Sequence, residues 1–191
     1  MRLHAAWIAA LALGLAGCAT TSGPDITVDY DRTADLGSYT TYGFPEKVGT
    51  DRAGYSTLIT RYFKDAVNRE MLRRGYVYDP TDPDLLVNFF TNVREVTEVR
   101  PSYGYGYYGY RYGLYGPWPY HDDYARSYKV GTANIDIVDG ERMQVVWEGV
   151  AEGRITKADM KNPRVAIDGV VAQLFQRFSG TAAPEKDAVT G

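Results

Sequence analysis

Cys18 is the only cysteine in this chain of 191 residues, and it strongly constrains how the chain can fold. Without a second cysteine, no disulfide can close a loop within the chain. The fold must therefore rest on its hydrophobic core, and a chain of this length is expected to form one domain. The cysteine follows Leu15, Ala16 and Gly17 at the end of an apolar run, so its position also bears on how the chain is processed.

Residues 1–17 have the features of a secretory signal peptide. Arg2 provides a positive charge, residues 5–16 form an apolar stretch, and small residues precede Cys18. The stretch is too short to span a bilayer as a helix. The tetrapeptide at 15–18 resembles the bacterial lipobox, which implies that Cys18 becomes the first mature residue and is acylated, for example with palmitate. The alternative is an ordinary cleaved signal followed by a chance cysteine.

The residues after Cys18 bear on where an acylated chain would reside. Ala19 and Thr20 resemble the pattern of lipoproteins released to the outer membrane, whereas an Asp at position 19 resembles a retention signal. The resemblance implies the periplasmic face of the outer membrane, with acyl chains on Cys18 as the membrane contact. Residues 18–25 are small and polar, and we interpret them as the acylated N-terminus and a tether.

Hydrophobic periodicity predicts an α+β domain over residues 26–178. Alternating apolar residues predict strands, and apolar residues at three- and four-residue spacing predict helices. The expected strands are 26–30, 39–44, 84–99, 130–138 and 143–151, and the expected helices are 52–74 and 163–178, the last opened by Asn162 and Pro163. Two such helices and these strands favour packing of both helices on one face of a mainly antiparallel β-sheet. Residues 179–191 are predicted to be a disordered tail.

The last two expected strands form a hairpin. Asp139 and Gly140 predict a tight turn between them. Strict alternation in the second strand places Val145 and Trp147 on one face and Val146 on the other. Trp147 is interpreted as a core residue, with a role in ligand contact as the less favoured alternative.

A Gly/Tyr-rich insertion occupies residues 101–128, between two expected strands. It holds ten of the 17 tyrosines and five glycines and has no strand or helix periodicity, so a long hairpin excursion is expected. Tyrosine rings can stack on sugar rings or pack against protein, which makes the insertion a candidate contact with peptidoglycan or an envelope protein. The alternative is a neutral low-complexity insertion. The candidate binding residues are Tyr103, Tyr105, Tyr107, Tyr108, Tyr110, Tyr112, Tyr115, Trp118 and Tyr120.

The sequence offers no catalytic constellation and no metal site. After the signal peptide the only histidine is His121, which lies in the irregular insertion where positioning would be poor. Asp79, Asp82 and Asp84 are close in sequence, but intervening prolines indicate turn residues that bond their own backbone. No cofactor motif is present in a strand-to-helix context. The formal net charge of −3 argues against nucleic acid as a partner.

Several short blocks resemble a known lipoprotein family, the one with domain of unknown function 4136. The blocks are Val28-Asp29-Tyr30-Asp31, Tyr39-Thr40-Thr41-Tyr42, Pro83-Asp84-Leu85-Leu86-Val87, Ile135-Asp136-Ile137 with Asp139, and Val146-Trp147-Glu148-Gly149-Val150-Ala151. The resemblance covers roughly residues 26–178. The resemblance implies a fold and a cell-envelope address rather than an activity.

These observations predict a lipid-anchored, non-enzymatic binding or scaffolding module in the periplasm. Two alternatives belong to other classes of protein. One is a carrier that holds a small apolar ligand between helix and sheet, which a buried cavity would favour. The other is a hydrolase whose site uses Asp, Tyr and Arg without His, which converging carboxylates with perturbed pKa values would favour.

Overall fold

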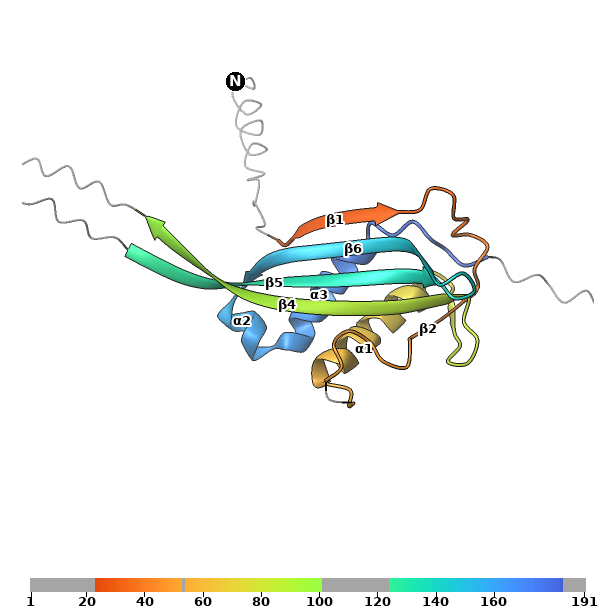
Figure 1. The fold of residues 1–191 in the computed structure, drawn as a ribbon, viewed down its shortest axis with the longest axis horizontal. Helices are drawn as coiled ribbons and strands as arrows, with labels where there is room; N and C mark the ends of the chain where they lie inside the picture. The colour runs from red at the N-terminus through yellow and green to blue at the C-terminus, as the bar shows by residue number, and fades with distance from the viewer. Residues whose placement is uncertain (1–22, 53, 101–123, 184–191) are drawn as a thin grey trace, which may run out of the picture.

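The computed structural model describes residues 23–52, 54–100 and 124–183. Within these ranges the chain forms a six-stranded sheet and three helices (Figure 1). The strands are β1 (Asp25–Tyr30), β2 (Thr41–Gly43), β3 (Val77–Tyr78), β4 (Leu85–Arg100), β5 (Tyr124–Asp139) and β6 (Gln144–Ile155), and the helices are α1 (Leu58–Arg73), α2 (Lys157–Lys161) and α3 (Pro163–Phe175). The α+β class predicted from the sequence is confirmed.

The sheet is mixed, so the prediction of a mainly antiparallel sheet is wrong. Its strand order is β1-β6-β5-β4-β2-β3. The first four strands pair antiparallel, whereas β2 pairs parallel with both β4 and β3. Strands β2 and β3 have only three and two residues, too few for an alternating pattern to reveal their direction or, for β3, its existence.

Helix α1 begins later than the periodicity predicts and ends where predicted. The side chain of Thr57 caps its N-terminus by accepting a hydrogen bond from the backbone N–H of Thr60. Tyr55 and Leu58, which lie within the expected helix 52–74, are mostly exposed. Gly75, with φ of 88°, takes the left-handed conformation just after the helix.

Helix α3 begins at Pro163 as predicted, and a short helix that the sequence analysis missed precedes it. At the start of α2 the hydroxyl of Thr156 accepts a hydrogen bond from the backbone N–H of Asp159. In return, the carboxylate of Asp159 accepts a hydrogen bond from the backbone N–H of Thr156. This reciprocal capping box stabilises the helix start. Five residues are too few to show an amphipathic pattern, which explains why the sequence did not indicate α2.

Helices α1 and α3 lie on one face of the sheet and the core fills the space between them (Figure 1). Phe63 of α1 stacks on Phe89 of β4 with ring centroids 5.0 Å apart. The ring of Trp147 in β6 packs edge-on against the ring of Phe178, just beyond α3, with ring centroids 5.4 Å apart. Trp147 is only 1% exposed, so its interpretation as a core residue is confirmed.

A β-bulge corrects the predicted faces of β6. Ile137 pairs with Trp147 while the next residue, Val138, pairs with Val145, so Val146 is the extra residue on β6. As a result Val146 and Trp147 are both buried and Val145 is 46% exposed. Strict alternation had placed Val145 beside Trp147, and it failed because the inserted residue reverses the alternation at that point.

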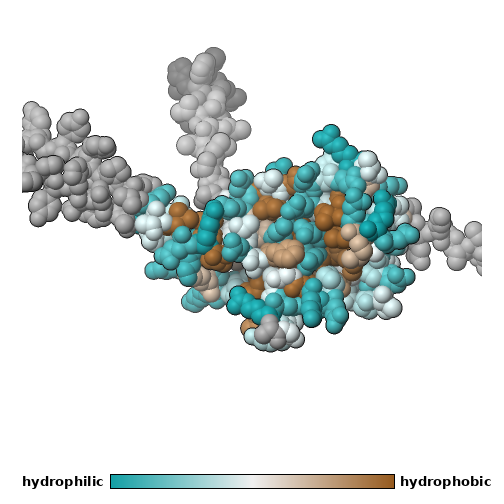
Figure 2. Space-filling view, viewed as in Figure 1, coloured by the Kyte–Doolittle hydropathy of each residue, from teal (hydrophilic) through white to brown (hydrophobic). Residues whose placement is uncertain are grey.

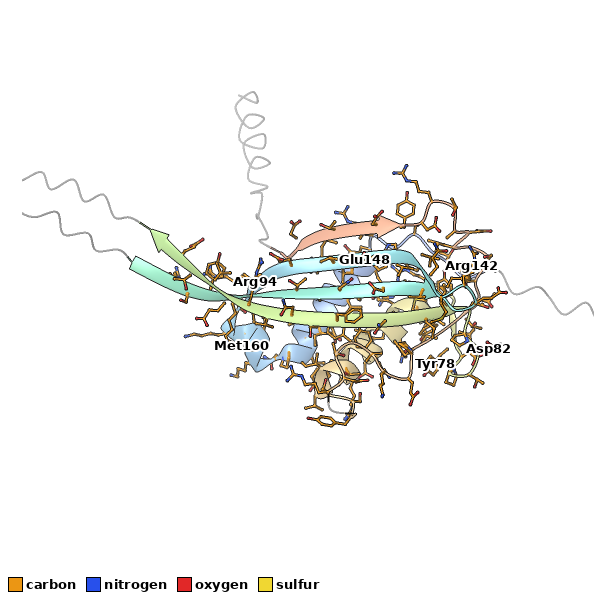
Figure 3. All side chains as sticks on the ribbon, viewed as in Figure 1. Tyr78, Asp82, Arg94, Arg142, Glu148 and Met160 are labelled. Atoms are coloured by element: carbon orange, nitrogen blue, oxygen red, sulfur yellow. The ribbon has the colours of Figure 1, made fainter. Side chains whose placement is uncertain are left out.

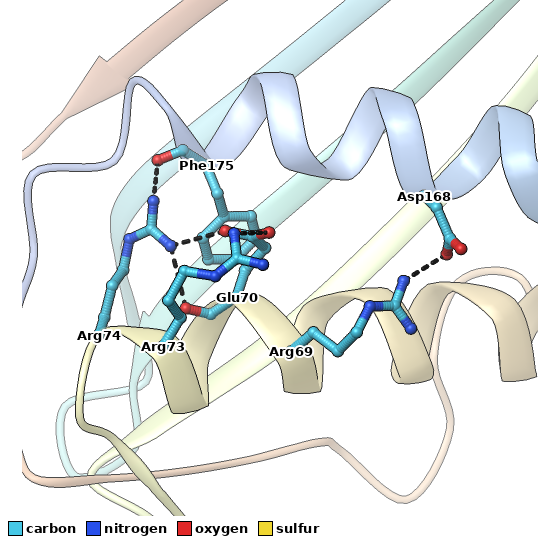
Figure 4. Close-up of polar contacts among 6 residues, drawn as sticks. All are labelled: Arg69, Glu70, Arg73, Arg74, Asp168 and Phe175. Carbon is cyan, nitrogen blue, oxygen red and sulfur yellow. Dashed lines mark hydrogen bonds and ion pairs between the residues drawn. The ribbon is translucent and has the colours of Figure 1, made fainter.

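A cluster of polar contacts joins the ends of α1 and α3 (Figure 4). The carboxylate of Glu70 is nearly buried and accepts hydrogen bonds of 2.8 Å from both Arg73 and Arg74. Arg74 also donates to the carbonyl oxygen of Phe175 at the end of α3. Further along, Arg69 forms a 2.5 Å ion pair with Asp168. These contacts satisfy the buried charge and fix the two helices relative to each other.

Asp139 organises the turn between β5 and β6, which is longer than the predicted tight turn. The backbone N–H of Met143 donates to the carbonyl oxygen of Asp139 at 2.8 Å, so the connection comprises residues 140–143. The side chain of Asp139 accepts hydrogen bonds from the backbone N–H groups of Glu141 and Arg142. Because the Asp139 carboxylate satisfies these two backbone N–H groups, it stabilises a connection of four residues. The Asp139-Gly140 pair had predicted a two-residue turn.

Several predicted boundaries change in the structure, and three of the changes redefine a predicted segment. Strand β1 begins at Asp25, so the tether ends one residue earlier than predicted. Strand β5 begins at Tyr124, so residues 124–128 belong to the sheet and not to an irregular insertion. Residues 179–183 are not a disordered tail, because Ala182 and Ala183 donate backbone hydrogen bonds to the carbonyl oxygens of Arg74 and Tyr39. Sequence composition does not reveal these contacts, which arise only after the chain folds.

Candidate binding surface on the exposed face of the sheet

The structure places few of the predicted site residues. Cys18, His121 and the nine aromatic residues of the candidate binding loop lie outside the described residues. The predicted hairpin excursion therefore stays a prediction, although its two flanking strands pair up to Arg100 and Tyr124. Asp79 does bond its own turn, accepting from the backbone of Thr81 and Asp82.

Asp84 also has a structural position. Its carboxylate accepts hydrogen bonds from the backbone N–H groups of Thr40 and Thr41 and from the Thr40 hydroxyl, at 2.7 to 2.9 Å. Burial acts to raise the pKa of Asp84, but these hydrogen bonds outweigh it and hold the pKa below its ordinary value. Asp84 thus remains ionised and joins β4 to the start of β2.

The face of the sheet opposite α1 and α3 carries the polar side chains of four strands. It faces the viewer in Figure 1, and Figure 2 shows it as largely hydrophilic with small apolar patches. Figure 3 labels Arg94 on β4 and Glu148 on β6. We call this surface the exposed face. Its polar residues are Asp25, Thr27 and Asp29 of β1, Glu148, Glu152 and Arg154 of β6, Thr132, Asn134 and Asp136 of β5, and Asn88, Asn92 and Arg94 of β4.

Three carboxylates lie in one row across the exposed face. The strand register places Asp29 beside Glu148, Glu148 beside Asp136, and Asp136 beside Asn88. Directly opposite residues on paired strands are close enough for their side chains to interact. The row is therefore a locally acidic stripe, bordered on β4 by an amide.

Two polar atoms beside this row are buried without a hydrogen-bond partner among the described residues. They are Oδ1 of Asn134 and Oδ1 of Asp136. The amide nitrogen of Asn134 is occupied, because it donates to Glu148 Oε1 at 3.1 Å. An unpaired buried acceptor costs free energy, so a donor that reached either oxygen would remove that cost.

The environment of Asp136 alters its acidity. Burial, followed by the negative charge of Glu148, raises the pKa of Asp136, while the hydrogen bond with Asn134 partly opposes the shift. The row thus contains a carboxyl that releases its proton less readily than an exposed aspartate. Such a group can accept a hydrogen bond when ionised or donate one when protonated.

A hollow of about 420 Å³ lies beside the row on the same face. The residues that line it include the apolar Val130 and Val150 and the polar Thr27 and Glu152. The guanidinium of Arg154 lies 4.0 Å from the centre of the Tyr128 ring, so an aromatic and a cationic group form one end of the hollow. The hollow therefore offers apolar contact and hydrogen-bonding groups together.

A second hollow, of about 270 Å³, lies near the end of β1 and is lined in part by Tyr30, Asp31 and Gln144. Neither of the two hollows lies between the helices and the sheet. That space is filled by large buried side chains, including Phe63, Phe89 and Trp147.

Two further features concern only the part of the chain that the structure describes. No group of three or more His, Cys, Asp or Glu residues there is arranged to hold a metal ion. None of the helices there is long and apolar enough to cross a membrane.

Sequence reasoning missed Asn134, Asp136 and Glu148 as a group. The alternation of polar residues at 132, 134 and 136 indicated an exposed face on that strand. It could not indicate which residue of the next strand lies beside Asp136, because the bulge at Val146 shifts the register by one residue.

Among the solved structures that match this chain, one with a TM-score above 0.5 supports the fold. A PDZ domain protein from Parabacteroides distasonis matches with a TM-score of 0.52 and 14% identity, covering 84% of this chain and 37% of that chain. This chain therefore corresponds to little more than a third of that protein. A dodecamer of a PelC variant from Paraburkholderia phytofirmans matches with a TM-score of 0.46 and 8% identity, covering 82% and 98% of the two chains. A minor lipoprotein from Acinetobacter baumannii matches with a TM-score of 0.39 and 9% identity, covering 73% and 92%.

Similarity at these identities concerns the fold alone. No curated protein matches the chain. A family model does match, over residues 26–178, a range that includes the described helices and strands apart from Asp25. The chain therefore belongs to the family described as domain of unknown function (DUF4136).

Proposed function

We propose that this protein is a lipid-anchored, non-catalytic binding module of the cell envelope, and that the exposed face of its sheet contacts a hydroxyl-rich glycan such as the glycan strands of peptidoglycan. The observation that carries the proposal is the pair of buried acceptors, Oδ1 of Asn134 and Oδ1 of Asp136, on a face that no described helix covers. Sugar hydroxyls can donate hydrogen bonds, and these two oxygens lack a hydrogen-bond donor among the described residues.

The surroundings of the two oxygens suit a glycan better than a strongly charged polymer. The exposed face mixes carboxylates with amides and hydroxyls, which together accept and donate hydrogen bonds at many positions. The neighbouring hollow of about 420 Å³ adds the ring of Tyr128 and the side chains of Val130 and Val150 as apolar contact area. The acidic row of Asp29, Glu148 and Asp136 would repel the phosphates of a nucleic acid.

The lipid anchor is proposed from the sequence. Acylation of Cys18 would hold the chain at a membrane, and residues 19–24 would separate the folded domain from the lipid. The residues that follow Cys18 favour the periplasmic face of the outer membrane, where peptidoglycan is within reach.

A hydrolase that works without histidine is the second candidate, and a specific observation favours it. The raised pKa of Asp136 beside Glu148 resembles the paired carboxylates of enzymes that cleave glycosidic bonds. The pair lies on an open sheet surface, however, and no described segment closes over it to exclude water. A structural carboxylate pair shows the same shift, so binding without catalysis is the function that we favour.

A binding assay with purified peptidoglycan tests the proposal. Asn134→Ala removes the unpaired amide oxygen and is expected to weaken sedimentation of the protein with peptidoglycan about fivefold, a loss typical of one or two hydrogen bonds. Asp168→Asn, on the helical side of the molecule, is the matched control and should bind like the parent. Equal binding by the parent and Asn134→Ala would refute the proposed surface.

The same preparation separates binding from hydrolysis. If the parent releases soluble sugar fragments from peptidoglycan and Asp136→Asn does not, the protein is a hydrolase. Binding without release supports the non-catalytic module.

A further inference from the structure

Among the described residues, no strand pairs with the outer edge of β4 over most of its length. On its inner side β4 pairs with β5 at every residue from Leu85 to Arg100. On its outer side it pairs with β2 only at Leu85 and Leu86. We define the β4 arm as residues 92–98 of this strand, which extend away from the helices (Figure 1).

The β4 arm is exposed on both faces. Asn92, Val93, Arg94, Glu95 and Thr97 are all exposed, and Val93 retains 57% of its accessible surface. A third strand supports only its base, because β6 stops pairing with β5 at Lys129, opposite Glu95. Beyond that point the arm is a two-stranded ribbon. An isolated two-stranded ribbon is marginally stable in water and gains stability from a further strand.

The charges of the arm restrict which strand can pair with it. Natural edge strands often carry charges of one sign that prevent pairing with another copy. The arm instead carries one cation, Arg94, and two anions, Glu95 and Glu98. Arg94 forms an ion pair with Glu152 of its own chain at 2.5 Å, and Glu98 also has an interaction within the chain. Both charged side chains therefore have an interaction partner in the single copy.

We propose that the outer edge of β4 pairs antiparallel with the same edge of a second copy of this chain, with Val96 on the twofold axis. A twofold axis perpendicular to the sheet keeps every side chain on its own face. In this register Arg94 lies opposite Glu98 of the second copy, and the symmetry repeats that pair on the other side of the axis. Glu95 lies opposite Thr97, which is neutral.

Neighbouring symmetric registers lose this charge complementarity. Placing Glu95 on the axis brings two glutamates directly opposite each other, and placing Thr97 there puts Glu98 opposite Val96, so that Glu98 no longer faces Arg94. Like charges directly opposite each other on paired strands are destabilising, whereas opposite charges are stabilising. The register centred on Val96 is thus the one that the charges of the arm favour, and it joins the two sheets into one continuous sheet.

Charge reversal in two differently tagged full-length copies tests this pairing, with copurification from detergent extracts as the readout. Arg94→Glu alone places two glutamates opposite each other in both symmetric pairs, and Glu98→Arg alone places two arginines there. Each variant is expected to copurify with itself about tenfold less than the parent does. A mixture of one copy with Arg94→Glu and one with Glu98→Arg restores both opposite-charge pairs, so copurification should return to near the parental level.

Two controls make the result specific. Glu152→Gln removes the partner of Arg94 within the chain and should leave copurification unchanged. Val96→Cys should give a disulfide-linked dimer under oxidising conditions, whereas Asn92→Cys, which would lie far from its own copy, should not. Failure of the mixture to recover, absence of parental copurification, or crosslinking of Val96→Cys to a different segment or protein would each overturn the proposal.

Discussion

The hydroxyl of Tyr39 donates a 2.8 Å hydrogen bond to Oδ2 of Asp139, a residue one hundred positions later in the chain. The same carboxylate oxygen accepts from the guanidinium of Arg142 at 3.0 Å, and the second oxygen accepts from two backbone N–H groups in the turn. Asp139 is only 3% exposed. One buried carboxylate therefore connects the segment before β2 to the turn between β5 and β6.

The first prediction concerns Asp139. Asp139→Asn should lower the free energy of unfolding at pH 7 by about 1.5–3 kcal/mol, because the charged acceptor of several hydrogen bonds is lost. Tyr39→Phe, which removes one donor only, should cost about 1 kcal/mol. Urea denaturation measures both. A loss below about 0.5 kcal/mol in Asp139→Asn would contradict a structural role for the carboxylate.

The same carboxylate predicts a pH dependence. The backbone N–H of Arg142, together with the Tyr39 hydroxyl and the charge of Arg142, outweighs burial and holds the folded-state pKa of Asp139 below its ordinary value of 3.8. A lowered folded-state pKa contributes stability that is complete above the unfolded value and is lost as the pH falls through the folded value. The difference in unfolding free energy between the parent and Asp139→Asn should therefore shrink as the pH is lowered below 3.8.

The second prediction concerns the core. Trp147→Ala should lower the free energy of unfolding by about 3–5 kcal/mol, because a fully buried ring that contacts Phe175 and Phe178 is removed. Thermal or urea unfolding measures the change. A loss under about 1 kcal/mol would be incompatible with a buried ring and would revive the interpretation of Trp147 as a ligand contact.

The third prediction tests the bulge in β6. Val146→Ala should destabilise the domain by about 1–3 kcal/mol, because Val146 is buried, whereas Val145→Ala at the exposed position should change stability by less than about 0.5 kcal/mol. The two variants remove the same atoms from adjacent residues, so each is the control for the other. The reverse order of effects would indicate regular alternation without a bulge.

The fourth prediction concerns the Gly/Tyr-rich segment. Strands β4 and β5 pair as far as Arg100 and Tyr124, so a short Gly/Ser linker in place of residues 103–122 can join them. Each doubling of loop length changes the closure free energy by only about 0.6 kcal/mol, so the melting temperature should stay within a few degrees of the parental value. Loss of cooperative unfolding would show that the tyrosines belong to the core.

Ligand binding by this loop variant separates two surfaces. If peptidoglycan binding is lost while the fold is kept, the tyrosines make the contact. If binding persists, the exposed face of the sheet accounts for it.

The fifth prediction concerns the anchor. Cys18→Ala should abolish labelling by palmitate and leave a precursor or a soluble form, because no thiol remains to be acylated. Membrane fractionation of cells expressing the variant and the parent measures the outcome. Palmitate labelling and fractionation equal to those of the parent would show that Cys18 is not the site of the lipid anchor.

The sequence by itself determined the elements whose patterns are long and local. Apolar periodicity within residues 52–74 and 163–178 predicted two amphipathic helices, which the structure forms over 58–73 and 163–175, and Pro163 marked the start of the second. The alternation around Phe89 and Ile135 specified the buried face of the central strands. Each of these signals acts within a few turns or residues, so no tertiary contact was needed to recognise it.

The tertiary structure alone decided what depends on pairing between distant segments. The two- and three-residue strands at the edge take their direction from β4, and the bulge at Val146 is defined only against Ile137 of β5. The candidate surface has the same origin, because Asp29, Asp136 and Glu148 become neighbours only when three strands take one register. Shifting a strand by one residue moves its side chains to the opposite face, so a surface assembled from several strands cannot be read from any one of them.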